Sequence, residues 1–383
     1  MINILYIHQS AELYGSDKTL LYLVSDIRDK GFHPIVVLPS NGPLFQALQQ
    51  AGIETIIAPV LKISRNMFRP GNLLSLPFQT FKAFGIIRKQ LKGRTLGWVH
   101  SNTLAVLLGA LYAKRYGVKH LWHVHEIIEH PRLISELYPK LVDFFSDKVV
   151  YNSKATMDFM VAQKPALAAK STVVHNGIER TVPPASAEAI AHLRQTQFSA
   201  GPSDIVLGLV GRISRWKGQS LLLEAFAALA PQYPMARLVF VGSAPPNQEH
   251  FEQSLRSKID ALQLRDRVAI IPFTTDIWQI WDSLDIAVVP STEPEPFGLV
   301  AVEAMLAAKP VVGAAHGGLT EIIIEGQTGL FFTPGDASAL QRALGKLIAD
   351  ASLRNTLGQN GKARAESHFS QNRYVEDFSR LYQ

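Results

Sequence analysis

The stretch of sequence that decides the fold is residues 290–304, PSTEPEPFGLVAVEA. It follows an apolar run at residues 285–289 that is typical of a buried strand, and it leads into a segment of helical period. Pro296 suits the first position of that helix, because its missing N–H group would have no partner there. In parallel α/β sheets, ligands bind where a strand turns into a helix, so this stretch predicts a binding site as well as a fold.

The polar groups of this stretch suit an oxygen-rich ligand. Glu295 lies in the turn, and Glu303 lies inside the helix. The N–H groups of Phe297, Gly298 and Leu299 come at the start of the helix, where they have no partner within it and can donate to a ligand. Two glutamates at this spacing are common by chance, but their place in a strand–turn–helix unit predicts a binding site.

Short apolar runs alternate with segments of helical period along the whole chain. This alternation predicts an α/β fold of two doubly wound, Rossmann-like parallel sheets with helices on both faces. The strands are expected at residues 3–8, 34–38, 54–58, 97–100, 120–124, 148–151 and 172–174, and then at 205–211, 237–241, 268–271, 285–289, 310–312 and 329–332.

The alternation breaks between residues 175 and 202, at an Asn-Gly turn and a Pro-Pro pair. A chain of 383 residues also exceeds the size at which one core keeps growing. We therefore predict an N-terminal domain at 1–180, a linker at 181–200 and a second domain at 201–370. Residues 371–383 carry apolar side chains on one helical face and are expected to pack back on the first domain.

Composition and termini exclude several classes of protein. The chain is 47% hydrophobic and contains no cysteine, so disulfides, thiolate metal sites and a cysteine nucleophile are excluded. Its first residues read as a strand and lack the charged region of a signal peptide. The longest apolar candidate for a membrane span, residues 95–113, includes His100, Ser101 and Asn102, which disfavours a span. We expect a cytoplasmic protein.

The net charge of +6 is unevenly distributed. No acidic residue occurs between Glu54 and Glu126, and part of this segment, within residues 62–94, has the pattern of a basic amphipathic helix. It is either a helix packed on the sheet with a solvated basic face, or a surface that docks to an anionic membrane or lipid-phosphate acceptor. No signature of nucleic-acid binding is present. The bases are Lys62, Arg65, Arg69, Lys82, Arg88, Lys89, Lys92, Arg94, Lys114, Arg115 and Lys119.

Residues 207–218, LGLVGRISRWKG, open the second domain. The strand ends at Gly211, and Arg212 and Lys217 follow in the loop before the next helix. A guanidinium that chelates oxygens and an ammonium that acts as a point charge suit a diphosphate, although they are also compatible with ordinary loop charges. Two later strand ends add Gly242, at a tight turn, and Phe273, whose ring can hold a nucleobase.

In the first domain, Gly15 and Ser16 follow the first strand. Gly15 permits close approach of an oxyanion and Ser16 can donate to it, but the pair is equally typical of a helix cap. His123 and His125 lie at the end of another strand, where side chains alternate between the two faces, and only one of the two histidines is expected at the ligand side. The cluster His-x-His-Glu lacks further ligands at a recognisable spacing, so we expect no metal site.

Several enzyme classes lack their motifs here. The sequence has no Gly-x-Gly, no Walker A motif, no Asp-x-Asp and no Gly-x-Ser-x-Gly. Dinucleotide-dependent dehydrogenases, P-loop ATPases, metal-dependent sugar-nucleotide enzymes of the Asp-x-Asp type and α/β-hydrolases are therefore not indicated.

In order and separation, the motifs of the second half resemble those of the GT-B retaining glycosyltransferases of family 4, the glycosyl transferases group 1 family. The first half resembles this family more loosely. The motifs are Gly211-Arg212, Lys217-Gly218, Glu295 with Glu303, and Gly317-Gly318-x-x-Glu321, and in the first half Gly15-Ser16, His125, Asn152-Ser153 and Asn176-Gly177-Ile178.

The resemblance implies a role for each matching residue in the second domain. Arg212 and Lys217 would neutralise the donor diphosphate as the bond to the leaving group breaks. Glu303 would bind ribose hydroxyls. Glu295, with the N–H groups of residues 297–299, would hold hydroxyls of the transferred sugar. Such fixed cations can replace a divalent metal, so the resemblance implies no metal and no cofactor apart from the nucleotide-sugar donor.

In the first domain, the resemblance favours His125 over His123 as the residue that contacts the sugar near the reacting centre. Gly15 and Ser16 would close on the phosphate. The chain departs from the family in two places. Gly242 is followed by Ser243 and Ala244, where a Gly-x-Gly after the second strand of the second domain is usual, and the N-terminal turn has one glycine where a pair is common.

The resemblance implies transfer of a hexose, with retention of configuration, to a hydroxyl acceptor in the cleft between the domains. A UDP-sugar donor is favoured and GDP-mannose comes next. The acceptor is expected to be a lipid-linked glycan or polysaccharide intermediate, which would place the protein on the inner face of the membrane. Two alternatives remain open: a non-hydrolysing nucleotide-sugar epimerase, and a non-catalytic subunit that binds a nucleotide sugar or a lipid.

Overall fold

The computed structural model describes residues 1–61 and 70–383, which form two compact units. The first unit consists of Met1–Ile178 together with Ser370–Gln383, and the second of Glu179–Phe369. Each unit contains one parallel sheet flanked by helices, so the predicted fold class is confirmed.

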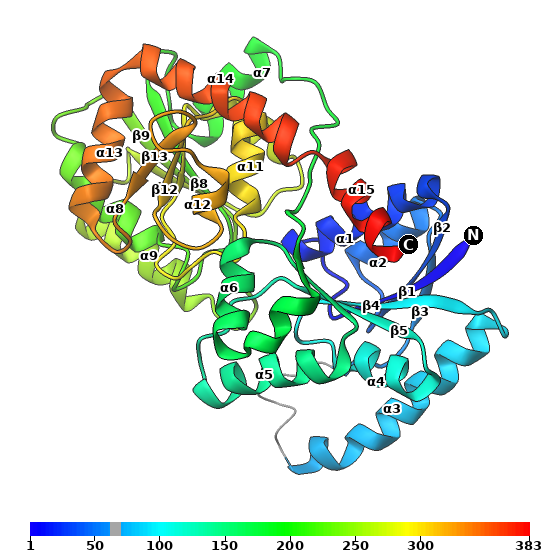
Figure 1. The fold of residues 1–383 in the computed structure, drawn as a ribbon. Coiled ribbons are helices and arrows are strands. Elements are labelled where there is room, and N and C mark those ends of the chain that lie inside the picture. The colour runs from blue at the N-terminus through cyan, green and yellow to red at the C-terminus, as the bar shows by residue number, and fades with distance from the viewer. Residues whose placement is uncertain (62–69) are drawn as a thin grey trace. The chain divides into compact units, whose positions relative to one another are not determined.

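The sheet of the first unit has seven strands in the order β3-β2-β1-β4-β5-β6-β7. Strands β1 to β5 are labelled in Figure 1. The order reverses between β1 and β4, and the carboxyl ends of these two strands are therefore the expected ligand position of the unit. The strands are β1 (Ile2–His8), β2 (Phe32–Leu38), β3 (Glu54–Ile57), β4 (Leu96–Asn102), β5 (Lys119–Val124), β6 (Lys148–Tyr151) and β7 (Ser171–Val173).

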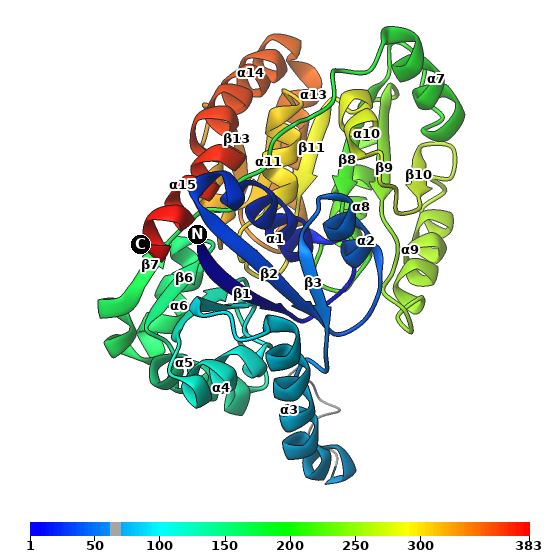
Figure 2. The ribbon, with the colours of Figure 1, turned by 90° about the vertical axis from the view of Figure 1, so that its right-hand side faces the viewer.

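Helices cover both faces of this sheet (Figure 2). α1, α2 and α15 bury apolar side chains on one face, and α3 and α4 do so on the other. The helices are α1 (Gly15–Asp26), α2 (Pro43–Gln50), α3 (Pro70–Leu91), α4 (Leu107–Tyr116), α5 (Arg132–Phe145), α6 (Lys154–Gln163) and α15 (Gln371–Tyr382), with short 3-10 helices at Ile27–Lys30 and Pro165–Lys170.

The C-terminal helix α15 packs on the first unit, as the sequence predicts. Its Tyr382 accepts a hydrogen bond from Trp98 Nε1 through its main-chain oxygen at 2.9 Å, and its hydroxyl lies 2.6 Å from His100 Nδ1. Tyr374 and Phe378 are buried beside it. About 280 residues of sequence separate these partners, and α15 therefore contributes to the core of the first unit from the other end of the chain.

The sheet of the second unit has six strands in the order β10-β9-β8-β11-β12-β13, with its reversal between β8 and β11. The strands are β8 (Ile205–Val210), β9 (Ala236–Val241), β10 (Val268–Ile271), β11 (Ile286–Val289), β12 (Val311–Ala314) and β13 (Gly329–Phe332). The helices are α7 (Ala187–Gln197), α8 (Gln219–Leu229), α9 (His250–Ala261), α10 (Ile277–Ser283), α11 (Leu299–Leu306), α12 (Leu319–Ile322), α13 (Ala337–Ala349) and α14 (Ala351–His368).

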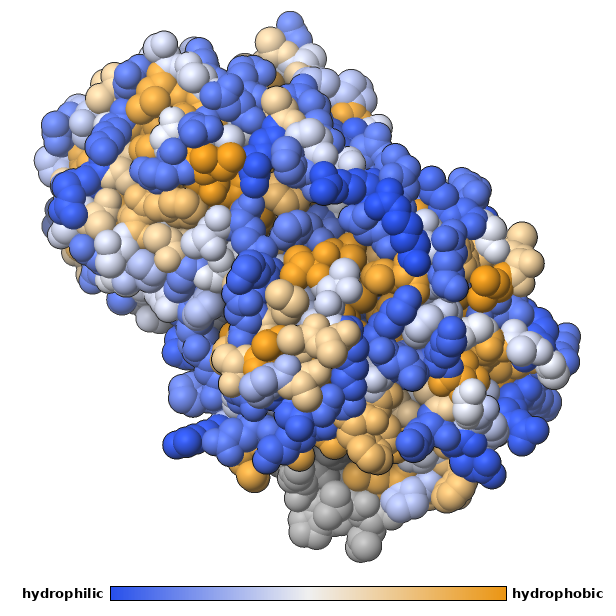
Figure 3. All heavy atoms as spheres, in the orientation of Figure 1, coloured by the Kyte–Doolittle hydropathy of each residue, from blue (hydrophilic) through white to orange (hydrophobic). Residues whose placement is uncertain are grey.

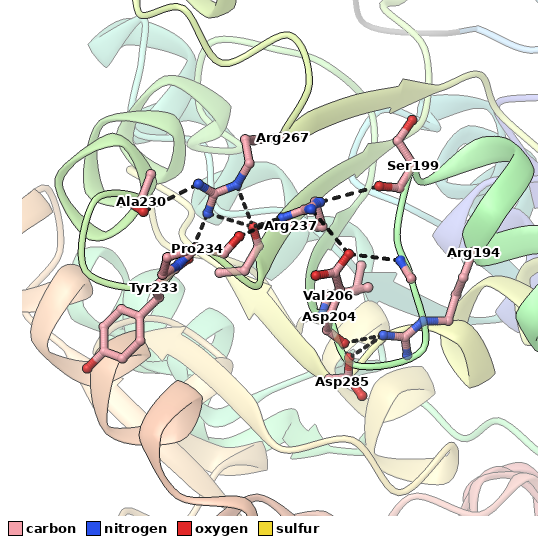
Figure 4. Close-up of polar contacts among 12 residues, drawn as sticks. Arg194, Ser199, Asp204, Val206, Ala230, Tyr233, Pro234, Arg237, Arg267 and Asp285 are labelled. Atoms are coloured by element: carbon pink, nitrogen blue, oxygen red, sulfur yellow. Dashed lines mark hydrogen bonds and ion pairs between the residues drawn. The ribbon is translucent and has the colours of Figure 1, made fainter.

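Residues 181–200, where we expected the linker, include α7 and belong to the second unit. Polar contacts attach them to the amino ends of the strands: Arg194 of α7 lies 3.2 Å from Asp285, and Arg237 of β9 donates to the main-chain oxygen of Ser199 at 3.3 Å (Figure 4). Upstream of α7, both terminal nitrogens of Arg180 donate to the carboxylate of Asp282 at 2.7 Å.

None of the helices within the described ranges is long and apolar enough to cross a membrane. Residues 95–113, the candidate span, fold mostly as β4 and α4. In the basic region, Lys62, Arg65 and Arg69 lie outside the described residues. The rest of that region contains α3. This helix buries Ala83, Phe84, Ile87 and Leu91, whereas its Phe78 and Phe81 are 71% and 70% exposed.

Candidate functional site

The loops after β8 and β11, which flank the reversal of the second sheet, meet through an ion pair. Nζ of Lys217 lies 2.6 Å from Oε1 of Glu295, and the two side chains are only 16% and 5% exposed. The ammonium also lies over the ring of Trp216, 4.2 Å from its centroid. An ammonium has three N–H donors, so this pairing leaves two of them for a ligand while it fixes the position of the cation.

The Glu295 carboxylate is held from several sides. Ser291 donates its hydroxyl to the same Oε1 at 2.5 Å, and Gly318 N–H donates to the main-chain oxygen of Glu295 at 2.7 Å. His316 Nε2 in turn donates to the main-chain oxygen of Ser291 at 2.9 Å. Oε2 of Glu295 has no hydrogen-bond partner in the part of the chain that the structure describes. The carboxylate is therefore rigid and keeps one oxygen to accept from a ligand.

Two glycines let the strand-end turns approach each other closely. Gly218 has φ of 79°, and a Cβ there would lie 2.0 Å from the main-chain oxygen of Pro290. Gly242 has φ of 141°, and a Cβ there would lie 2.1 Å from the main-chain oxygen of Gly211. The N–H group of Gly242 donates to the main-chain oxygen of Ile271. Gly242 therefore lets the two turns lie close together but has no free N–H group for a ligand. Both positions favour glycine because φ is positive.

The start of α11 presents main-chain donors next to the carboxylate. Gly298, with φ of 107°, is its N-cap residue. Within the described residues, the N–H groups of Gly298 and Leu299 make no hydrogen bond, and their donation to a ligand stays a prediction. The ring of Phe297 is 3% exposed and packs edge-on against Phe369, so only the main chain of this residue is placed to contact a ligand.

Glu303 is on the first turns of α11 and is 4% exposed. Its Oε2 lies 3.3 Å from the indole Nε1 of Trp281, which donates to it from α10. Trp281 is not among the residues predicted from the sequence, because residues 277–283 have the pattern of an ordinary amphipathic helix. The signal that could have found Trp281 is its position, four residues before the strand expected at residues 285–289. The carboxyl end of that strand leads to Glu295 and Glu303.

Arg212 and Phe273 are more exposed than the glutamates. Arg212 directly follows the Gly211 turn, and its main-chain oxygen accepts from Gln219 Nε2 at 2.9 Å, which ties the loop to α8. Phe273 is 47% exposed at the end of β10, and its N–H donates to Ser243. A ring in this position can cover a flat apolar ligand.

In the first unit, Gly15 is the first residue of α1, and a Cβ there would meet no atom within 4 Å. The space beside Gly15 is therefore open, and the binding of a ligand by Gly15 and Ser16 stays a prediction. Asp17, one residue further, is 3% exposed and accepts from the N–H of Tyr14 at 2.9 Å. The Asp17 carboxylate therefore binds a main-chain N–H group at the N-terminus of α1 through one oxygen and contacts His8 of the sheet through the other.

Asp17 is part of a buried hydrogen-bonded chain at the carboxyl ends of β1, β4 and β5. His8 Nε2 lies 2.5 Å from Asp17 Oδ1, Asn102 Nδ2 lies 3.0 Å from His8 Nδ1, and His125 Nε2 lies 3.1 Å from Asn102 Oδ1. The chain joins His125, which the sequence predicts as a site residue, to three residues that it did not. His8 and Asn102 each end a strand at the sheet reversal, so the strand order identifies them and the local sequence pattern does not.

The two candidate histidines have different surroundings. His123 is fully buried, its ring lies 5.0 Å from that of Phe378 in α15, and neither ring nitrogen has a hydrogen-bond partner among the described residues. Burial lowers its pKa well below the usual value. His125 is 8% exposed and reaches Asn102, and burial lowers its pKa to about 3. Both rings are neutral near pH 7, and His125 is the one placed beside the open α1 turn.

Within residues 1–61 and 70–383, no group of three or more histidine, aspartate or glutamate side chains could hold a metal ion. The cluster of His123, His125 and Glu126 does not form a metal site. His123 is buried in the core, and the Glu126 carboxylate accepts from the main-chain N–H groups of Leu104 and His125. Metal independence of the reaction stays a prediction.

Both halves of the chain match families of known proteins. Residues 194–364 match the family described as glycosyl transferases group 1, and residues 14–182 match glycosyltransferase family 4. CapM, a capsular polysaccharide biosynthesis glycosyltransferase of Staphylococcus aureus, is 30% identical over 179 residues, which are 47% of this chain and 46% of CapM. LpcC, a lipopolysaccharide core biosynthesis mannosyltransferase of Rhizobium leguminosarum bv. viciae, is 29% identical over 214 residues, 55% of this chain and 59% of LpcC. These matches span about half of the length of the curated relatives.

A similar solved structure covers the whole chain. The crystal structure of Anabaena HepE in complex with UDP and glucose matches with a TM-score of 0.87 and 26% identity, over 100% of this chain and 99% of HepE. HepE has also been solved with UDP and with UDP-glucose.

Proposed function

This chain belongs to the GT-B glycosyltransferases of family 4, and from that premise we propose that it transfers a hexose from a nucleotide-diphosphate sugar, with retention of configuration, to a hydroxyl of a glycan. The observation that carries the proposal is the ion pair between Lys217 and Glu295 at the reversal of the second sheet. It brings a cation suited to a diphosphate into contact with a carboxylate suited to sugar hydroxyls.

Each group at this site has a task in the proposed transfer. Lys217 and Arg212 stabilise the negative charge that develops on the diphosphate leaving group, without a metal ion. Glu295 accepts from a hydroxyl of the transferred sugar through Oε2, and the N–H groups of Gly298 and Leu299 donate to the ligand. Glu303 accepts from the ribose hydroxyls. For His125 we propose a contact with the transferred sugar.

A UDP-sugar is the donor that we propose first. The complexes of HepE with UDP and UDP-glucose support this choice at 26% identity over the full chain. GDP-mannose comes second, supported by the mannosyltransferase LpcC. For the acceptor we propose a lipid-linked glycan or polysaccharide intermediate, in line with the names of CapM and LpcC.

A lipid-linked acceptor requires a surface that can approach a membrane, and we propose α3 with its neighbours for that role. Phe78 and Phe81 project from α3, and Leu133 and Phe144 of α5 are 77% and 67% exposed. Figure 3 shows apolar side chains interspersed with hydrophilic ones over this part of the first unit. The exposed bases between them, Lys82, Arg88, Lys89, Lys114 and Arg115, would attract anionic lipid headgroups.

A thermal-shift screen of UDP-, GDP-, ADP- and dTDP-sugars in the presence of EDTA tests the donor. A ligand that binds only the folded protein stabilises it by about 2.7 kcal/mol at 100 times its Kd. We expect UDP-sugars to raise the unfolding temperature without metal, and no response to any nucleotide sugar contradicts the proposal. Turnover of a bound sugar without acceptor would indicate the epimerase instead. Binding with no turnover in the presence of lipid-linked glycans would indicate a non-catalytic subunit.

A further inference from the structure

The contacts of Asn102 determine which side-chain atom faces each neighbour. Asn102 ends β4 and is 1% exposed. Its Nδ2 lies 3.4 Å from the main-chain oxygen of Ser16 and 3.0 Å from His8 Nδ1, and its Oδ1 lies 3.1 Å from His125 Nε2. A main-chain oxygen only accepts hydrogen bonds, so the atom that faces Ser16 must be the NH2 group. The orientation of the amide therefore follows without any assumption about the histidines.

This orientation assigns the proton of His125. The Asn102 oxygen only accepts, so His125 Nε2 must carry a proton and donate it. Burial lowers the pKa of His125 to about 3, so its ring is neutral at neutral pH and carries a single proton. Nδ1 is then an acceptor, and it makes no hydrogen bond to any residue that the structure describes. Nδ1 is the ring nitrogen left for a ligand.

His8 and Asp17 support the same arrangement from the other side. The second N–H of Asn102 points to His8 Nδ1, so the proton of His8 is on Nε2, where it is donated to Asp17 at 2.5 Å. The main-chain oxygen of Asn102 also lies 3.3 Å from His8 Nδ1. That longer contact would be a hydrogen bond only with a proton on Nδ1, which the nearer Asn102 N–H opposes.

We propose that Asn102, held by Ser16, His8 and Asp17, is a positioning residue that keeps the proton of His125 on Nε2 and thereby presents Nδ1 as the acceptor for a hydroxyl of the transferred sugar. The identity of the ligand rests on the proposed function, whereas the place of the proton does not. The opposite tautomer would turn an N–H group towards the ligand and leave the buried Asn102 Oδ1 without a donor, which disfavours it.

The tautomer can be measured directly on the full chain. Long-range 1H–15N spectra of protein with 15N-labelled histidine report which nitrogen of each ring carries the proton, and His125→Gln identifies the signal of His125. We expect the proton on Nε2 of His125 between pH 6 and 8. In Asn102→Leu, which offers no acceptor, we expect a mixture of the two tautomers. A proton on Nδ1 in the unchanged protein overturns the proposal.

Kinetics of the same variants separate positioning from a structural role. We expect Asn102→Leu to lower kcat about 10–100-fold, the usual cost of losing a group that orients a site residue, with donor KM changed less than about threefold. Asn102→Asp still accepts from Nε2, but its charge raises the pKa of His125. Its activity should approach that of the unchanged protein at high pH and fall as the pH drops, because protonated His125 has no acceptor nitrogen. Unchanged tautomer and kcat in Asn102→Leu also contradict the proposal.

Ser101→Ala is the matched control. Ser101 precedes Asn102 in β4, is fully buried, and contacts a different histidine, His120, at 2.9 Å. It should leave the tautomer of His125 and kcat unchanged. If Asn102→Leu does not fold, the spectrum of the unchanged protein and the pH profile of Asn102→Asp decide the question. A chain that turns over no nucleotide sugar would refute the proposed function, while the spectra would still decide the place of the proton.

Discussion

Lys217 Nζ and Glu295 Oε1 lie 2.6 Å apart, although 78 residues separate them in the sequence. The contact joins two residues that the sequence analysis assigned to different parts of the ligand, the diphosphate and the transferred sugar. Because Glu295 holds the cation before any donor binds, little reorganisation is needed at the moment of transfer, which is the condition for strong electrostatic stabilisation.

Loss of either partner should abolish most of the activity, for different reasons. We expect Lys217→Met to lower kcat/KM about 10²–10³-fold, as the loss of a charge-stabilising donor usually does. Glu295→Gln should also lower kcat/KM, because a neutral amide binds both the Lys217 ammonium and the sugar hydroxyl more weakly than a carboxylate does. Initial rates with a saturating acceptor measure both, and the near-normal activity of either folded variant would refute that residue's role.

The stability of the same variants provides a second test. Lys217→Met leaves a buried carboxylate with Ser291 as its remaining described side-chain donor, which should cost about 3–5 kcal/mol of unfolding free energy. The double variant Lys217→Met/Glu295→Gln should recover part of this loss, because no buried charge remains unpaired. Arg215→Met is the matched control. Arg215 and Glu293 form an ion pair between the same two loops, but both side chains are exposed. The free energy of unfolding measured in urea should therefore change little in this variant.

Trp281 should act on donor binding through Glu303. Trp281→Phe keeps an aromatic ring in the core but removes the N–H that donates to Glu303 at 3.3 Å. A hydrogen bond to a charged group contributes about 1.5–3 kcal/mol, so we expect the Kd of the donor to rise about tenfold or more, with kcat changed much less. Titration calorimetry measures the Kd. Trp278→Phe, on the same helix but stacked with Arg180, should bind the donor normally, and equal losses in both variants would contradict the prediction.

The fold and most of the second site could be predicted from the sequence, because both depend on local patterns. Strand–turn–helix units have a recognisable period, and Glu295, Glu303 and Lys217 lie within such units. His8, Asp17 and Asn102 could not be found in this way. Their function depends on the order β1-β4-β5, which brings together side chains that are about 90 residues apart, and an Asn at a strand end has no distinctive local signal.

The stability of the first unit should depend on pH through its buried histidines. Burial lowers the pKa of His120 from 6.5 to about 4 in the folded protein. Its stabilising contribution is full above pH 6.5, where both states are neutral, and declines as the pH falls from 6.5 to 4, because the unfolded chain takes up the proton first. The expected loss is about 3 kcal/mol for this residue. Urea midpoints between pH 7 and 4.5 should fall less in His120→Gln than in the unchanged protein.

The exposed His368 offers the control for this experiment, since His368→Gln should follow the pH profile of the unchanged protein. Identical profiles in His120→Gln and the unchanged protein would show that His120 becomes protonated in the folded state without a cost.

Docking of α3 to lipid should require both its aromatic and its basic side chains. Phe78 and Phe81 are 71% and 70% exposed. Burying such a ring in a bilayer interface contributes about 1.5–3 kcal/mol to the free energy of binding. We expect the protein to cosediment with vesicles that contain anionic lipid, more weakly as the salt concentration rises, and Phe78→Ser/Phe81→Ser to weaken this binding at least about tenfold. Leu262→Ser, at an exposed site of the second unit, should bind normally. Equal binding to neutral vesicles, or no difference between the variants, would refute docking through α3 and leave it as a helix that packs on the sheet with a solvated basic face.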